Sequence, residues 1–491
     1  MALMSRPTVL STRDEKRVAG QPGPATAPGP ATGPGPATGP GPATLPIVLT
    51  GVFVTILDFF IVNVAIPTTQ HDLHAGDSAI EWVVAGYGLA YGSGLVLGGR
   101  LGDVFGRRRM FSLGLALFTL ASVACGLAPD AGTLVAARVA QGASAALLAP
   151  QVLAILRTTY HGRAQLRAIN AYALTMGLAA VFGQLIGGVL IQADLFGLGW
   201  RACFLINLPI GAAAVAFARR AVPESRLGRT VRLDLGGTAL ITLALAALLL
   251  PLIEGRGQGW PVWTWLSFAL AAALFTGYAV RRHESPVIDP ALFRERAFSA
   301  GLLTQLAFAM GMPAYFLIFA LYVQRGRGMD ALHAGLIFVP IGVGYLAASL
   351  LASRLVARLG RQVIALGGVT RAASLSVLLV AVARHAPVGA LVPVLAVDGI
   401  GMGLMLAPLM GTVLSRVTPR QAGAVAGALT TAMQLGGALG VAIVGILFYG
   451  GVSGGTTSAF GHGLVYLIAV TLAVAALVQA LPRGRAGAGP A

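Results

Sequence analysis

Four charged residues lie inside long apolar runs of the sequence, where a charge needs a partner or a task. Asp58 and Asp398 are the acids that fall clearly within such runs, and Arg138 and Arg371 are the bases. A charged side chain at the centre of a bilayer costs about 2.5–3.5 kcal/mol even on insertion scales. Removal from water favours the neutral form of a carboxylic acid, so each acid can take up a proton. These residues predict proton or ion chemistry inside a membrane.

Asp58 and Arg138 each have two interpretations. Asp58 stands about twelve residues into its run. There it would bind a proton or a cationic substrate, each expelling the other, or form a structural hydrogen bond to a neighbouring helix. Arg138 stands nearer the outer end of its run. It would pair with a carboxylate and change that group's proton affinity, or extend to the membrane interface.

Arg371 and Asp398 are expected to form a second charged pair. They stand about ten residues in from opposite ends of consecutive runs. At 1.5 Å of rise per residue, both lie about 15 Å deep, close to the bilayer midplane. We expect a salt bridge between them, which serves either as a static strut or as a protonation switch.

The runs that carry these residues have the composition and length of membrane spans. The chain has 491 residues, of which 56% are hydrophobic and 10% charged, whereas soluble domains carry about 25% charged residues. Runs of about 20 apolar residues cross a hydrocarbon core, and a barrel would instead show alternating segments of about ten residues. We therefore expect an all-α polytopic membrane protein. The fourteen predicted spans are residues 46–66, 80–101, 110–127, 133–156, 166–192, 200–218, 233–253, 260–280, 298–323, 334–353, 363–383, 388–413, 422–449 and 463–481.

The net charge of +17 reflects membrane topology. The arginines sit in short loops between runs, and alternate loops are strongly basic, which is the pattern of the positive-inside rule. An even number of spans then places both termini in the cytoplasm. The sequence predicts contact with the lipid bilayer and no nucleic-acid partner. No metal is expected, because the seven histidines and two cysteines lack ligand spacing.

The sequence contains an internal duplication. Residues 132–150 resemble 389–408, residues 100–107 resemble 354–361, and residues 173–175 resemble 428–430, always at an offset of about 255 residues. This predicts two parallel six-helix bundles, spans 1–6 and 9–14, with spans 7 and 8 inserted between them. Transporters built from such repeats bind substrate between the halves, near the midplane.

The expected organisation has five parts. Proline and glycine repeat too densely in the first residues to allow a packed core. The parts are a disordered Pro/Gly/Ala/Thr-rich cytoplasmic tail (1–44), an N-terminal six-helix bundle (45–220), inserted helices 7 and 8 with cytoplasmic linkers (221–296), a C-terminal six-helix bundle (297–482) and a cytoplasmic C-terminal tail (483–491).

A polar, basic stretch between the second and third spans is a candidate cytoplasmic gate. Asp103 would hold the cytoplasmic side shut by charge pairing or by contact with a helix N-terminus, and release when that side opens. The duplicated copy has Ala357 at this position, so the latch exists in one bundle only. The residues expected to act there are Gly99, Asp103, Gly106, Arg107 and Arg108.

Two further groups are candidates for the region between the bundles. The fifth span carries Gly183, Gln184, Gly187 and Gly188, which would make a tight, mobile contact between bundles or ordinary small-residue packing. A set of aromatic residues would line a large apolar cavity suited to lipophilic molecules, or simply face lipid or core. The aromatic residues are Phe59, Phe60, Tyr87, Tyr91, Tyr315, Phe316 and Phe319.

Four motifs in order resemble the major facilitator superfamily, and within it the fourteen-helix drug:proton antiporters. The resemblance covers residues 45–481. One position departs from the family pattern, because Gln184 stands where the antiporter motif has proline. The motifs are Leu57-Asp58 with Asn63 and Pro67, Gly99-x-Leu101-x-Asp103-x-x-Gly106-Arg107-Arg108, Arg138-x-x-Gln141-Gly142, and Trp200-Arg201-x-x-Phe204 with Asn207, Pro209 and Gly211.

The resemblance implies a secondary active transporter and not an enzyme. Such a protein would export lipophilic, drug- or antibiotic-like small molecules across the bacterial cytoplasmic membrane by alternating access. It would be multi-pass, work as a monomer, exchange its substrate for protons and need no cofactor besides the proton gradient. One alternative is a facilitator or importer of a metabolite, for which the spans hold few polar side chains. The other is a membrane sensor or enzyme, which would need a catalytic cluster that the sequence lacks.

Overall fold

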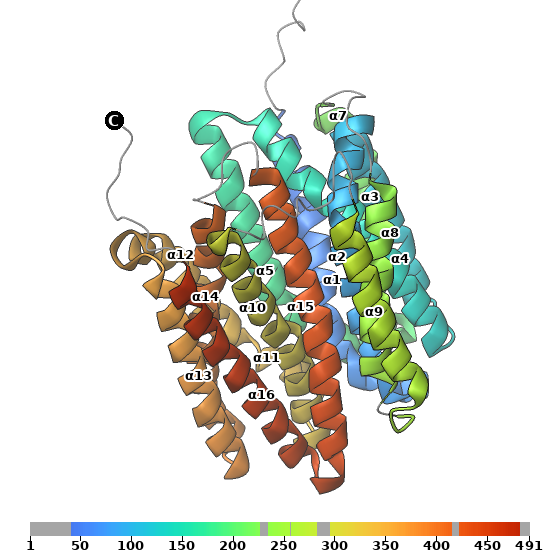
Figure 1. Ribbon diagram of the computed structural model, residues 1–491. Coiled ribbons are helices and arrows are strands. Elements are labelled where there is room, and N and C mark those ends of the chain that lie inside the picture. Colours follow the sequence, from blue (N-terminus) through green and yellow to red (C-terminus); the bar gives the residue numbers. More distant parts are fainter. Residues whose placement is uncertain (1–40, 226–233, 256, 282–294, 415–421, 482–491) are drawn as a thin grey trace, which may run out of the picture. The chain divides into compact units, whose positions relative to one another are not determined.

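A computed structural model describes residues 41–225, 234–255, 257–281, 295–414 and 422–481 (Figure 1). Residues Pro40–Ala491 form one compact unit. Within the described residues the regular structure is helical throughout, without strands. The predicted C-terminal tail, and all but residues 41–44 of the predicted N-terminal tail, lie outside the described residues.

The described chain contains the predicted set of membrane-spanning helices. Thirteen segments are long and apolar enough to cross a bilayer, and α2 adds a fourteenth if its two parts, which meet at a bend of 48°, form one span. The prediction of an all-α polytopic protein is therefore confirmed. The sixth and tenth predicted spans are each interrupted, by short turns before α7 and between α11 and α12.

The bounds of the elements follow the predicted runs closely. The N-terminal half contains α1 (Thr44–Asp72), α2 (Asp77–Phe105), α3 (Arg107–Gly126), α4 (Ala131–Thr159), α5 (Gly162–Ala193), η1 (Leu195–Gly197), η2 (Gly199–Arg201), α6 (Ala202–Leu205) and α7 (Asn207–Ala221). The inserted helices are α8 (Leu235–Glu254) and α9 (Val262–Val280). The C-terminal half contains α10 (Arg296–Leu321), η4 (Tyr322–Gly326), α11 (Ala331–Leu336), α12 (Val339–Leu359), α13 (Gln362–Ala383), α14 (Val388–Leu414), α15 (Ala422–Gly451), η5 (Val452–Gly454), α16 (Thr456–Leu477) and η6 (Val478–Ala480).

The helices pack as two bundles with an inserted pair. In the N-terminal half α4 packs on α2 and α3, and α5 packs on α1; in the C-terminal half α14 packs on α12 and α13, and α15 packs on α10. The inserted helix α8 packs on α9, α2 and α15, and so covers one side of the seam between the bundles (Figure 1). This is the predicted arrangement, while the residue boundaries given for the five parts remain predictions.

The two bundles meet along α2 and α15, along α5 with α11 and α12, and along α1 and α10. We call the helix ends that carry Arg107–Arg109 and Arg157 the arginine-rich end. At the opposite end, Gln324 Nε2 donates to the backbone oxygen of Val64 at 3.1 Å, and Arg325 Nη2 donates to Gln70 Oε1 at 2.6 Å. These hydrogen bonds join the bundles at the end opposite the arginine-rich end.

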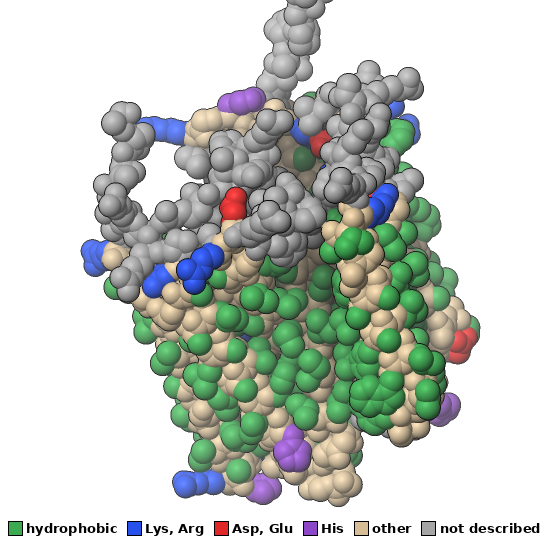
Figure 2. Space-filling view, in the orientation of Figure 1, with side chains coloured by type: hydrophobic (Ala, Val, Ile, Leu, Met, Phe, Trp, Pro, Cys, Tyr) green, Lys and Arg blue, Asp and Glu red, His purple; other side chains and the backbone are tan. Residues whose placement is uncertain are grey.

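The outer faces of the helices carry apolar side chains that no protein covers. Leu120 is 64% exposed, Leu350 73% and Trp265 63%. On the face shown in Figure 2, hydrophobic side chains cover the middle of the molecule, while Lys and Arg gather mainly towards its upper end. Lipid tails are the solvent that such a surface requires, because water would not stabilise it.

The polar stretch between the second and third spans is helical almost throughout, which corrects the expected loop. Helix α2 continues to Phe105, α3 starts at Arg107, and Gly106 alone separates them with φ of +105°. Arginine is a good helix former, so polarity here marks the membrane edge and not the helix end. The second bundle repeats the geometry, with Gly360 at φ +56° between α12 and α13.

Candidate functional site

Asp58 lies at the centre of a polar cluster buried within the N-terminal bundle. Its side chain, on α1, is 0% exposed. Asp58 Oδ2 accepts a hydrogen bond from Arg138 Nη1 at 2.5 Å, and Oδ1 accepts from Gln141 Nε2 at 2.8 Å and Asn207 Nδ2 at 3.2 Å. Helices α4 and α7 thus supply one charged and two neutral donors to a single carboxylate.

Arg138 is directed inward, so of its two interpretations the pairing with a carboxylate is present and the extension to the membrane interface is wrong. The residue is 1% exposed. Its Nε donates to the backbone oxygen of Val83 at 3.0 Å, and Nη1 also donates to Gln141 Oε1 at 2.7 Å. The guanidinium carbon lies 4.4 Å from the centre of the Tyr87 ring. Hydrogen bonds, an anion and an aromatic face together replace water around this buried cation.

Several members of this cluster were not assigned a role from the sequence. Asn207 Nδ2 also donates to Ser122 Oγ at 2.9 Å, and Ser122 Oγ donates to the backbone oxygen of Phe204 at 2.9 Å. Gln141 and Asn207 are polar amides inside apolar spans and belong to two of the family motifs. Their position in the spans was the sequence feature that could have indicated a role in this cluster. Asn63, by contrast, donates to the backbone oxygens of Phe59 and Phe60 in its own helix.

Glu81 is a buried acid that sequence position did not reveal. It lies in the second turn of α2 and is 0% exposed. A Cβ atom added to Gly445 of α15 would come within 2.4 Å of the Glu81 carboxyl carbon. A glycine on the opposite bundle therefore leaves space for this carboxylate where the two bundles meet. The sequence of α2 alone cannot indicate that space, because it depends on a residue of another helix.

The predicted salt bridge between Arg371 and Asp398 is present in the second bundle. Arg371 Nε and Asp398 Oδ1 are 3.3 Å apart, and each residue is 1% exposed. Arg371 Nη2 has no hydrogen-bond partner within the described part of the chain. The guanidinium carbon of Arg371 lies 5.7 Å from the centre of the Tyr315 ring. This pair has fewer contacts than the cluster around Asp58.

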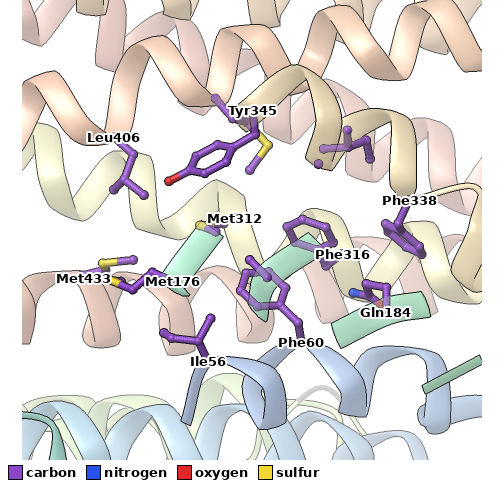
Figure 3. A pocket seen from close by; sticks show the side chains of 14 residues that line it. Ile56, Phe60, Met176, Gln184, Met312, Phe316, Phe338, Tyr345, Leu406 and Met433 are labelled. Atoms are coloured by element: carbon purple, nitrogen blue, oxygen red, sulfur yellow. The ribbon is translucent and has the colours of Figure 1, made fainter. Parts of the chain in front are cut away.

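A cavity lies between the bundles, lined by α1 and α5 from one side and by α10, α12, α14 and α15 from the other (Figure 3). It offers about 70 Å³ to water-sized molecules, whereas pockets for drug-sized ligands have about 300–1,000 Å³. A substrate of that size therefore needs the bundles to part. The lining residues are Ile56, Phe60, Met176, Ala180, Gln184, Met312, Phe316, Phe338, Ile341, Gly342, Tyr345, Met402, Leu406 and Met433.

A second, smaller cavity adjoins the first and reaches towards the buried cluster. It offers about 50 Å³, shares Ile56, Phe60, Met312 and Met433 with the first cavity, and is also lined by Tyr87. Asp58 lines neither cavity, whereas Tyr87, whose ring covers Arg138, lines the second cavity. One aromatic ring thus touches both the charged cluster and the space between the bundles.

The aromatic prediction holds in part, since most of these residues line cavities between the bundles but the cavities are small and not large. Its members at these cavities are Phe59, Phe60, Tyr87, Tyr91 and Phe316. Tyr315 and Phe319 instead stack on each other at 5.6 Å, buried away from both cavities.

A family model described as the Major Facilitator Superfamily matches residues 48–441. The chain belongs to the Major Facilitator Superfamily. This agrees with the two-bundle fold and confirms a transporter rather than an enzyme, as the sequence motifs predict.

Relatives in the superfamily match most of the chain. A probable actinorhodin transporter of Streptomyces coelicolor is 37% identical over 429 residues, covering 85% of this chain and 74% of the relative. A puromycin resistance protein of Streptomyces alboniger is 35% identical, covering 85% and 83%. A cephamycin export protein of Amycolatopsis lactamdurans is 35% identical, covering 88% and 91%.

Solved structures of other superfamily transporters share the fold. A nucleoside transporter aligns with a TM-score of 0.64 at 11% identity, covering 89% of this chain and 98% of its own. A D-xylose–proton symporter aligns with a TM-score of 0.63 at 16% identity, covering 90% and 98%.

The glycines of α5 divide between two partners in this superfamily member. Cβ atoms added to Gly183 and Gly187 would meet Phe60 and Ile61 of α1, within the same bundle. A Cβ on Gly188 would come within 2.4 Å of the backbone oxygen of Ala331 in α11. Because successive residues turn about 100° around a helix, Gly188 faces the other bundle while Gly183 and Gly187 do not, which corrects the predicted contact between bundles for those two. Gly177 of α5 also faces the other bundle, since an added Cβ would come within 2.7 Å of Leu346 in α12.

The junction between α2 and α3 is held by two separate acids. Asp103 Oδ1 accepts from Arg107 Nη2 at 2.8 Å, which is the expected charge pair, formed across Gly106. Contact with a helix N-terminus, expected of Asp103, is made by Glu224, whose Oε1 accepts from the Arg108 backbone N–H at 3.1 Å. The segment after α7 therefore anchors this superfamily motif, and gating by Gly99, Asp103 and Arg107 remains a proposal.

Replacing Asp103 with alanine is expected to shift the conformational balance with little loss of stability. The side chains of Arg107 and Asp103 are 12% and 29% exposed, and partly exposed pairs contribute below about 1 kcal/mol. If Asp103 holds the arginine-rich side shut, its loss opens that side and closes the other. Labelling of a cysteine introduced at Gln192, which lines a hollow at the opposite end, should then decrease.

Both native cysteines are buried, so background labelling should be low. Asp130→Ala is the control, because Asp130 pairs locally with Thr133 at the end remote from Arg107. Equal labelling in wild type and Asp103→Ala would reject a gating role for this junction.

Proposed function

We propose that this superfamily member exports lipophilic, drug- or antibiotic-like molecules across the cell membrane in exchange for protons. The observation that carries the proposal is a pair of adjoining apolar cavities between the bundles whose lining residues carry no charge. The smaller cavity is lined by Tyr87, whose ring lies against Arg138 of the buried ion pair with Asp58. Relatives named for antibiotic transport, resistance and export support the substrate class. The proton gradient is the energy source, and no cofactor is proposed.

Asp58 is the proposed proton site. When Asp58 is ionised, it neutralises Arg138; when it is protonated, Arg138 becomes a buried cation without its anion. Gln141 and Asn207 still hold the acid in either state, because neutral amides pair with both forms. Since Asp58 lines neither cavity, substrate and proton compete through the position of Tyr87 and Arg138, and not by direct displacement of a cation from Asp58.

The proposed orientation places the arginine-rich end and both termini in the cytoplasm. The hydrogen bonds of Gln324 and Arg325 and the close approach of Gly188 to Ala331 then join the bundles on the outer side. This conformation is proposed to be closed to the outside. One chain supplies both of the bundles that line the cavity, so we propose that the protein works as a monomer in the lipid bilayer.

The test is transport by purified protein in liposomes with an imposed pH gradient. We expect a lipophilic aromatic dye to move against the proton flow, and a protonophore to abolish the movement. Protein-free liposomes measure passive leakage. Dye movement in the same direction as protons would favour the metabolite-importer alternative, and movement independent of the gradient would reject proton coupling.

A further inference from the structure

Gln184 places an amide without a partner at the wall of the cavity between the bundles. The residue lies on α5 and is 0% exposed. Neither its Nε2 nor its Oε1 has a hydrogen-bond partner among the residues that the structure describes. Buried side-chain polar atoms are nearly always paired, so an unpaired amide needs an explanation. Figure 3 shows the Gln184 amide among the side chains that line the cavity.

The other lining residues define what kind of molecule would pair with this amide. None of the fourteen carries a charge. Three phenylalanines and Tyr345 offer flat faces for an aromatic molecule. The lining also contains flexible, polarisable methionine side chains, which adapt to ligands of different shape. They are Met176, Met312, Met402 and Met433.

The absence of charge in this lining argues against a permanently cationic substrate. A cation that enters an apolar site loses its hydration and needs a carboxylate or several aromatic faces in return. The acid nearest in sequence to the lining, Asp58, is occupied by Arg138, Gln141 and Asn207. An uncharged molecule loses far less solvation on entry.

We propose that Gln184 determines specificity by pairing with an uncharged aromatic molecule that carries a hydrogen-bond donor beside an acceptor, as in a lactam. An amide offers one acceptor oxygen and two donor hydrogens, so it matches such a group with two parallel hydrogen bonds. A site built to pair with a polar group strongly rejects the analogue that lacks it, because its own polar atoms then stay unpaired. This inference rests on the proposed function and names its substrate class.

Four probes of similar shape separate the contributions of the hydrogen-bond donor, the acceptor, the aromatic rings and a positive charge to binding. Phenanthridinone carries adjacent N–H and C=O groups, its N-methyl derivative keeps the acceptor alone, phenanthrene has neither, and N-methylphenanthridinium is a cation. Binding of each is measured to the purified full-length protein in lipid nanodiscs. We expect wild type to bind phenanthridinone at least about ten-fold more tightly than phenanthrene or the cation.

Gln184→Leu should remove this preference. We expect phenanthridinone affinity to fall about 10–100-fold, to the level of phenanthrene, because two neutral hydrogen bonds are lost, while phenanthrene affinity stays unchanged. Gln184→Met, which keeps the length of the side chain, gives the same readout if the leucine variant fails to fold. Gln305→Leu is the matched control, because Gln305 is equally buried, has no partner for its amide among the described residues, and lies outside the cavity lining.

The outcomes separate the two proposals. Equal loss for all four probes, no change in Gln184→Leu, or wild-type binding that favours the cation would each overturn the role of Gln184. The same would follow if the wild type bound none of the probes. If wild type exchanges the probes for protons but shows no lactam preference, this inference fails and the proposed function stands. If the probes bind with the expected ranking but no transport depends on a proton gradient, the proposed function fails instead.

Discussion

Replacing Asp58 with asparagine is expected to abolish the coupling of transport to protons. Asparagine has the same shape and retains an oxygen acceptor for Gln141 or Asn207, but it cannot titrate. Coupling between two ligands is typically worth 1–3 kcal/mol, about 5–150-fold in affinity. We therefore expect the wild type to bind substrate with an affinity that changes about 5–150-fold between the protonated and ionised states of Asp58, and Asp58→Asn to show no such change.

The measurement is substrate affinity and proton release by the purified protein over a range of pH. Asp58→Asn also leaves Arg138 without an anion, and breaking a buried pair costs about 3–5 kcal/mol of stability. A double variant, Asp58→Asn with Arg138→Gln, removes the unpaired cation and should recover stability without recovering coupling. Loss of function in this stable double variant therefore reports proton chemistry and not misfolding.

Asp234→Asn is the matched control for Asp58→Asn. Asp234 is also a buried acid paired with an arginine, since Arg281 Nη1 lies 2.6 Å from its Oδ1, but it belongs to the inserted helices. It accepts the Gly237 backbone N–H at the start of α8, and asparagine caps a helix about as well as aspartate. We expect normal coupling in Asp234→Asn. Proton release that persists unchanged in Asp58→Asn would exclude Asp58 as the proton site.

The fold was predictable because hydropathy and run length are properties of local sequence. A helix in lipid satisfies its own backbone, so each apolar run of sufficient length specifies one element without knowledge of its neighbours. The cost of burying charge likewise singled out Asp58, Arg371 and Asp398. Depth along consecutive helices was enough to predict the pairing of Arg371 with Asp398.

Contacts between helices were less predictable, because they depend on helix rotation and on the partner's surface. The sequence left open which carboxylate would pair with Arg138, and it gave no role to Glu81. Three features decided these contacts. They are the rotation of α4 that directs Arg138 inward, the space that Gly445 leaves for Glu81, and the rotation of about 100° around the helix axis from Gly187 to Gly188. None of these can be read from one apolar run alone.

Replacing Asp398 with asparagine is expected to weaken the protein without removing proton coupling. Protonation of Asp58 leaves two amides in place around the acid, but protonation of Asp398 would remove the charge that holds Arg371 Nε at 3.3 Å. Arg371 Nη2 already lacks a hydrogen-bond partner among the described residues. A buried guanidinium with so few neutral partners makes repeated loss of the anion costly, which favours a static strut over a switch.

A strut and a switch give opposite results when both charges are removed. Asp398→Asn alone should lower the free energy of unfolding by about 3–5 kcal/mol, because it leaves Arg371 buried and unpaired. Asp398→Leu combined with Arg371→Met should restore or exceed wild-type stability, since well-packed apolar replacements of buried ion pairs are neutral or stabilising by about 1–4 kcal/mol. If the pair only holds α13 to α14, this double variant releases protons normally on binding substrate. A stable double variant that no longer releases protons would instead make Asp398 a second proton site, and the two bundles would then each contribute a charge to coupling.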